Sequence, residues 1–83
     1  MGRLVKLWKA EDTDLRVVYL YGPSEEQRGR IACTKADGGI SLVEPLPGMS
    51  EHDDKFFYRD LAMVRLRKLY RSGEFPDEAT MAT

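Results

Sequence analysis

The first half of the chain contains short hydrophobic runs that alternate with turn-forming residues. The clearest run, residues 15–21, reads Leu-Arg-Val-Val-Tyr-Leu-Tyr and is rich in the β-branched and aromatic residues that favour strands. Residues 4–9, 30–34 and 40–44 form further runs of apolar residues with strand character. Because the connections between these runs are short, the pattern predicts a meander of four antiparallel strands.

Glycine and proline mark the expected ends of these strands. The Gly-Pro pair at 22–23 is expected to stop the second strand, because proline has no backbone N–H to donate. The next four residues, 24–27, fit a capping box that would form a single helical turn. The sequence Asp-Gly-Gly at 37–39 predicts a hairpin with glycine in the left-handed conformation. Two prolines within 45–48 are expected to end the sheet.

One long helix is predicted after these prolines. It should begin between Ser50 and Asp53, where side-chain oxygens can cap the first turn, and end near Ser72 before Gly73. At 100° per residue, one stripe of the helix consists of Tyr58, Leu61, Ala62, Leu66 and Leu69. The sequence therefore predicts a single α+β domain over residues 1–75, with the helix packed on the four-stranded meander. Residues 76–83 lack periodicity and are expected to form a loose tail.

The predicted strands carry apolar residues on both faces, whereas one helix covers only one face of a sheet. A helix of about 17 residues has a footprint of roughly 25 by 10 Å. Three arrangements would cover the second face: the sheet curls into a half-barrel, the N-terminal strand and long loop fold over it, or another molecule packs on it. We expect a homodimer or a partner-binding site, with strong curling of a monomer as the alternative. The candidate contact residues are Val5, Leu7, Trp8, Val18 and Leu20.

Charge is distributed unevenly, although the net charge is only −1. Residues 55–71 contain six basic residues and one acidic residue, which gives this segment a charge of +5 and leaves −6 for the remainder. The candidate anion-binding or partner-binding residues on the helix are Arg59, Arg67, Lys68 and Arg71. The alternative is a solvated helix face that complements the helix dipole, and a pI near 5.8 argues against a dedicated nucleic-acid binder.

The chemistry-bearing residues give little support for catalysis. The single cysteine, Cys33, is interpreted as a small buried hydrophobe, since the only histidine, His52, is distant in sequence. Residues 51–54 contain four possible metal-ligand side chains, but adjacent positions do not converge, so an acidic helix start is expected there. We find no phosphate-binding loop, nucleophile elbow or zinc-binding spacing. No catalytic or metal-binding residue is assigned, no cofactor is expected, and the chain is not predicted to be an enzyme.

Two functional hypotheses follow. The first is a non-enzymatic protein-interaction module that self-associates, or binds a partner protein, through the second apolar face of its sheet or through the loop of residues 22–29. The second is a nucleic-acid-associated accessory protein that uses the basic helix stripe. Aromatic stacking of bases on Trp8, Tyr19, Tyr21 or Tyr58 is a weaker variant, because strand aromatics usually belong to the core. The N-terminus lacks the apolar stretch of a signal peptide and no spanning segment is present, so a cytoplasmic protein without membrane contact is expected.

Overall fold

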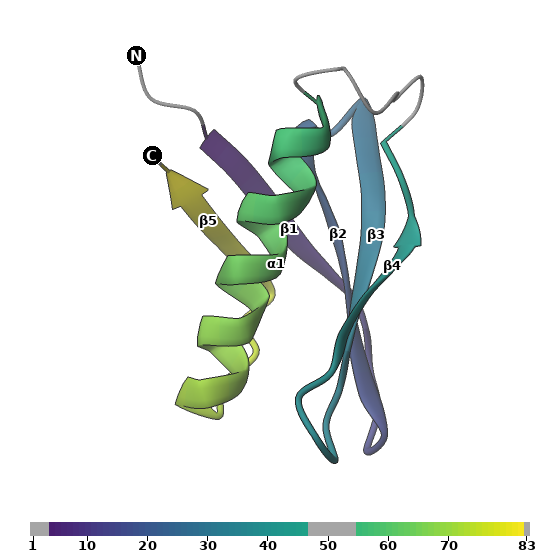
Figure 1. Cartoon of the computed structure of the whole chain (residues 1–83), viewed down its shortest axis with the longest axis vertical. Helices are drawn as coiled ribbons and strands as arrows, with labels where there is room; N and C mark the ends of the chain where they lie inside the picture. The colour runs from purple at the N-terminus through teal and green to yellow at the C-terminus, as the bar shows by residue number, and fades with distance from the viewer. Residues whose placement is uncertain (1–3, 47–54, 83) are drawn as a thin grey trace.

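The computed structural model describes residues 4–46 and 55–82, which form an antiparallel sheet with one helix packed on it (Figure 1). The elements are β1 (Leu4–Asp12), β2 (Arg16–Ser24), β3 (Gln27–Thr34), β4 (Ile40–Glu44), α1 (Lys55–Ser72) and β5 (Glu78–Ala82). The strand order is β4-β3-β2-β1-β5, so the first four strands form the predicted meander. The α+β class is therefore confirmed, and the sheet has five strands rather than four.

The fifth strand lies in the segment that the sequence predicts to be a loose tail. β5 pairs antiparallel with β1, from Leu4 opposite Ala82 to Trp8 opposite Glu78. The N–H of Lys9 extends this pairing by donating to the carbonyl of Asp77 at 2.8 Å. The expectation of a loose tail is wrong, because five residues of weak local pattern gain their order from the free edge of β1, far away in sequence.

The hairpin between β2 and β3 also differs from the prediction. β2 continues through Gly22 and Pro23, and Ser24 pairs with Gln27 across a two-residue turn. A register shift between Tyr21 and Ser24 absorbs the irregularity that the proline introduces. The predicted strand stop at 22–23 and the predicted helical turn at 24–27 are therefore both wrong.

The hairpin between β3 and β4 and the end of the helix follow the sequence prediction. Gly38 has φ of 75° and donates its N–H to the carbonyl of Thr34 at 2.8 Å. α1 ends at Ser72, and Gly73 follows it with φ of 80°. The predicted start of the helix, between residues 50 and 53, lies outside the described residues.

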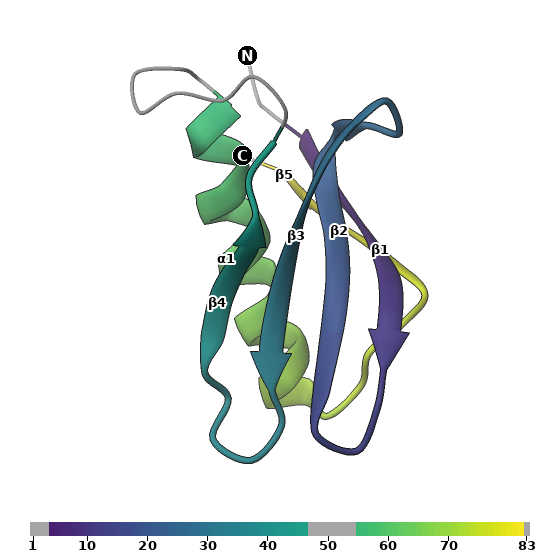
Figure 2. The same ribbon diagram turned by 90° about the vertical axis from the view of Figure 1, so that its right-hand side faces the viewer.

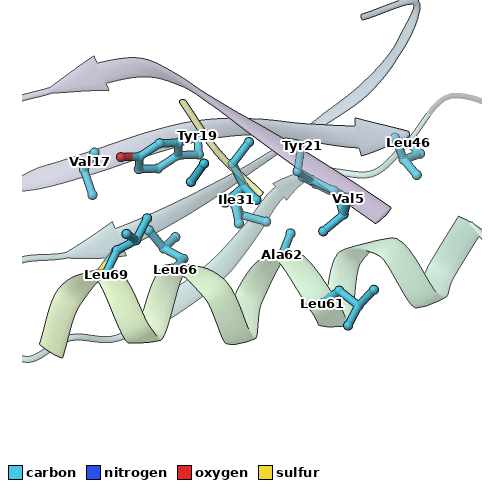
Figure 3. Packing of buried hydrophobic residues seen from close by; sticks show 13 residues of the cluster. Val5, Val17, Tyr19, Tyr21, Ile31, Leu46, Leu61, Ala62, Leu66 and Leu69 are labelled. Carbon is cyan, nitrogen blue, oxygen red and sulfur yellow. The ribbon is translucent and has the colours of Figure 1, made fainter. Parts of the chain in front are cut away.

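The core lies between α1 and one face of the sheet (Figure 3). The apolar helix stripe supplies Leu61, Ala62, Leu66 and Leu69, which are all buried, and Tyr58 is partly buried beside them. The strands supply Val5, Leu7, Val17, Tyr19, Tyr21, Ile31 and Cys33, all fully buried. The predicted buried stripe of the helix and the interpretation of Cys33 as a buried hydrophobe are thus confirmed. Burial also raises the pKa of the Cys33 thiol, which disfavours a nucleophilic thiolate.

Candidate interaction surface

The sheet face opposite α1 has no covering element among the residues that the structure describes (Figure 2). Side chains alternate across a strand, and the register places Trp8 beside Leu20, Leu20 beside Arg30, and Val18 beside Ala32. The pairs of β1 with β5 add Thr80 beside Lys6 and Glu78 beside Trp8. We call this surface the open face and define it by Lys6, Trp8, Val18, Leu20, Arg30, Ala32, Glu78 and Thr80.

The five predicted contact residues divide between the two faces of the sheet. Trp8, Val18 and Leu20 lie together on the open face. Val5 and Leu7 belong to the core beneath α1 and have no exposed surface. The structure therefore removes Val5 and Leu7 from the predicted interface, because a residue enclosed by the chain's own helix cannot contact a second molecule.

Long charged side chains surround the apolar residues of the open face. The guanidinium of Arg28 lies 5.3 Å from the centroid of the Trp8 ring, within the range of a cation–π interaction. Nε of Arg30 lies 3.6 Å from Oε2 of Glu44 at one margin of the face. Val18 is only 6% exposed, whereas Trp8 and Leu20 remain half-buried. Arg28 thus lies over part of Trp8, and Trp8 and Leu20 are the partly exposed apolar members of the open face as defined above.

A hollow of about 280 Å³ lies on this surface, where β1 and β5 meet the turn between β2 and β3. Its charged and polar lining comes from Lys6, Glu25, Glu78 and Thr80, and Trp8 forms its aromatic wall. This volume is slightly below the range of about 300–1,000 Å³ that is usual for small-molecule sites. Side chains of both charge signs thus lie beside an aromatic ring in this hollow.

A second polar cluster, at the end of α1, has a structural role. Nζ of Lys9 donates to the carbonyl of Phe75 at 2.9 Å and forms an ion pair with Asp77 at 3.3 Å. The hydroxyl of Tyr19 donates to the carbonyl of Pro76 at 2.6 Å, and burial raises the pKa of Tyr19 to about 12. These contacts fix the connection between α1 and β5, so the cluster holds the fifth strand in place.

Asp12 belongs to the same cluster, and its lowered pKa implies that the stability of the fold depends on pH. Its carboxylate lies 2.5 Å from Nζ of Lys35 and 3.5 Å from Nζ of Lys9, and the hydrogen bond from Lys35 is the main reason that the pKa of Asp12 is lowered. Because the folded-state pKa is below the unfolded one, the contribution of Asp12 is present above the unfolded pKa and is lost as the pH falls through the folded pKa. We expect Asp12→Asn to destabilise the protein at neutral pH, with a difference from the wild type that disappears in acid.

Urea unfolding at a series of pH values measures this difference. The control is Asp14→Asn, because Asp14 is exposed and forms no ion pair with the residues described. A pH-independent effect of Asp12→Asn, or an equal effect of the control, would contradict the assignment.

The basic residues predicted on α1 do not all lie in one environment. Arg67, Lys68 and Arg71 are exposed and form no ion pair within residues 4–46 and 55–82. Arg59 is different, since its side chain is 22% exposed and its Nη2 lies 3.0 Å from Oδ1 of Asp60. The structure thus groups three of the four predicted residues near the C-terminal end of the helix and places Arg59 apart from them.

Other sequence hypotheses find less support in the structure. Tyr19 and Tyr21 are fully buried and cannot stack on bases, which leaves Trp8 and the half-buried Tyr58 of the four aromatic candidates. The possible ligands at 51–54 lie outside the described residues, and the remainder contains no cluster of three or more His, Cys, Asp or Glu side chains arranged for a metal ion. Within the described part of the chain, no helix combines the length and apolarity needed to cross a membrane.

The hollow beside Trp8 and the polar cluster around Lys9 carried no signal in the sequence. Both depend on β5, which brings Glu78 and Thr80 beside β1, and Asp77 beside Lys9. Predicting them requires recognising that residues 78–82 can pair with the free edge of another strand.

Comparison of the chain with protein-family models, with curated proteins and with solved structures finds no match.

Proposed function

We propose that this chain is a small non-enzymatic protein-interaction module that self-associates through the open face of its sheet. The observation that carries the proposal is the pair Trp8 and Leu20, which lie side by side on the face opposite α1 with no covering element in the described part of the chain. Large apolar side chains that remain partly exposed on the surface are typical of contact sites.

The size of the open face fits a second copy of the chain. β1 and β2 each have nine residues, which at about 3.3 Å per residue gives a length of roughly 30 Å. Five strands at about 4.8 Å spacing give a width of roughly 24 Å. Since the outer strands are shorter, the face offers roughly 600 Å², which approaches the ~800 Å² that each partner contributes to a standard interface.

The charges of the open face are suited to two-fold symmetry. Lys6 and Arg30 lie on the same surface as Glu78, and Glu25 borders it at the hollow. In a symmetric dimer the same patch meets itself, so charges on the patch are compatible with a stable contact when both signs are present. A face with a single charge sign would repel its copy, and the mixed face supports self-association over contact with a strongly charged partner.

Light scattering coupled to size-exclusion chromatography tests the proposal. At high micromolar concentration we expect the wild type to have twice its chain mass of 9.5 kDa. Leu20→Glu should produce a monomer, with a dissociation constant raised at least about 100-fold, because a carboxylate would be buried in the interface without a partner. Thr80→Arg is a second variant, which adds bulk to an exposed position of the open face without touching the core.

Val64→Glu is the matched control. Val64 is 44% exposed on α1, on the other side of the sheet, and receives the same new charge as Leu20. We expect this variant to remain dimeric, and circular dichroism verifies that all variants are folded. A monomeric wild type at high micromolar concentration overturns the proposal, as does a dimer that Val64→Glu disrupts and Thr80→Arg leaves intact.

A further inference from the structure

Three basic side chains lie together on the face of α1 that is directed away from the sheet. Arg67, Lys68 and Arg71 are exposed, and Arg67 and Arg71 are one helical turn apart and therefore neighbours. None of the three forms a hydrogen bond or ion pair with another residue of the described ranges. We call this group the outer basic row.

Charge separation within the chain strengthens the field of this row. The segment 55–71 carries +5, whereas the remainder carries −6. The single acidic residue of that segment, Asp60, lies 3.0 Å from Arg59 and about two turns away from the row. The electric field of a polyanion therefore orients this molecule so that α1 is directed towards the polyanion.

The surroundings of the row favour one class of partner. Protein contacts usually centre on a large apolar or aromatic anchor, but the only large exposed hydrophobic residue of the described part of α1 is Val64. A membrane-bound helix needs a free apolar face, and the apolar stripe of α1 is buried against the sheet. A phosphate backbone needs neither, because guanidinium and ammonium groups bind its oxygens directly.

We infer that the outer basic row binds the phosphate backbone of double-stranded nucleic acid without reading its sequence. This site goes beyond the proposed self-association, since it lies on the opposite side of the sheet and remains accessible when two copies join through their open faces. In such a dimer the two rows are directed outwards, and each contacts a duplex separately.

Three phosphate contacts imply weak and strongly salt-dependent binding. Each contact contributes about −0.9 to the slope of log K against log salt concentration, so the row predicts a slope of about −2.7 on duplex DNA. The affinity should therefore fall roughly 40-fold between about 50 and 200 mM salt. The affinity at fixed salt should be the same for duplexes of different sequence.

Fluorescence anisotropy of a labelled duplex DNA, titrated with the full chain at low salt, tests the inference. In the triple variant Arg67→Gln, Lys68→Gln, Arg71→Gln, we expect the affinity for the duplex to fall by at least a factor of about 10, because all three charges are removed. Glutamine is chosen because it has a similar helix propensity. The matched control compares two single variants, Arg71→Gln in the outer basic row and Arg16→Gln outside both the row and the open face. Each removes one exposed arginine charge, and only Arg71→Gln should weaken binding.

Two further probes distinguish other anionic partners: a poly-glutamate peptide and vesicles that contain phosphatidylserine. Duplex binding that shows the expected salt slope, and that only the helix variants weaken, supports the inference. No binding of duplex DNA at low salt overturns it, and so does an equal loss of affinity in Arg71→Gln and Arg16→Gln. Tighter binding of poly-glutamate or of the vesicles than of DNA also overturns it and assigns the row to an acidic protein or to a membrane surface.

Discussion

Leu66→Ala is expected to lower the free energy of unfolding by about 2–5 kcal/mol. Leu66 is fully buried in the middle of the apolar stripe of α1, where the helix packs on the sheet (Figure 3). Truncation removes apolar contact and leaves a cavity that neighbouring side chains fill only in part. A domain of 83 residues has a total stability of roughly 4–12 kcal/mol, so this single change removes a large fraction of it.

Urea unfolding followed by circular dichroism measures this loss. Val64→Ala is the matched control, because it truncates an aliphatic side chain on the same helix at a position that is 44% exposed. We expect the control to change stability by no more than about 0.5 kcal/mol, since alanine is also a good helix former. Equal effects of the two variants would show that the stripe does not form the main contact between helix and sheet.

Gly29→Ala is expected to destabilise the protein by about 1–3 kcal/mol, although alanine is normally better than glycine within a strand. A β-carbon at this position would lie 2.5 Å from the carbonyl oxygen of Glu44 and 2.7 Å from the ring of Tyr21. Tyr21 is fully buried and lies directly opposite Gly29 in the pairing of β2 with β3. Because Tyr21 is enclosed in the core and Glu44 belongs to β4, we expect the clash to be relieved by distortion of the sheet.

Thermal unfolding of Gly29→Ala compared with Gly39→Ala measures this effect. Gly39 is exposed in the turn between β3 and β4, and the nearest atom to a new β-carbon there is Oδ1 of the exposed Asp37, at 3.1 Å. We expect a decrease in melting temperature of several degrees for the first variant and little change for the second. An unchanged or higher melting temperature for Gly29→Ala would contradict the close packing of Tyr21 on Gly29.

The local sequence pattern predicts those elements that are determined by residues close to one another in the chain. The apolar stripe of α1 predicts its buried face, and Gly38 and Gly73 have the left-handed conformations expected of them. β5 could not be predicted in this way, because its five residues are ordered by the distant edge of β1. The polar contacts of Lys9 with Phe75 and Asp77 escaped prediction for the same reason.

The candidate site was predicted only in part, and the reason lies in the two apolar faces of β1. Alternation separates Val5 and Leu7 from Trp8, but alternation does not determine which face a helix covers when both faces are apolar. That choice depends on the packing of α1, which buries Val5 and Leu7 and leaves Trp8 on the open face. The basic content of residues 55–71 groups Arg59 with Arg67, Lys68 and Arg71, whereas the structure pairs Arg59 with Asp60 and places it apart from them.

The emission of Trp8 during dilution tests the central proposal most directly. Trp8 is the only tryptophan of the chain and lies on the open face, so its fluorescence reports on that surface without any label. If two copies join there, dilution from high micromolar to nanomolar concentration exposes the ring to water and shifts its emission to longer wavelength. Leu20→Glu should show the long-wavelength emission at every concentration. An emission maximum of the wild type that does not change on dilution, and that equals the maximum of Leu20→Glu, would contradict self-association through the open face.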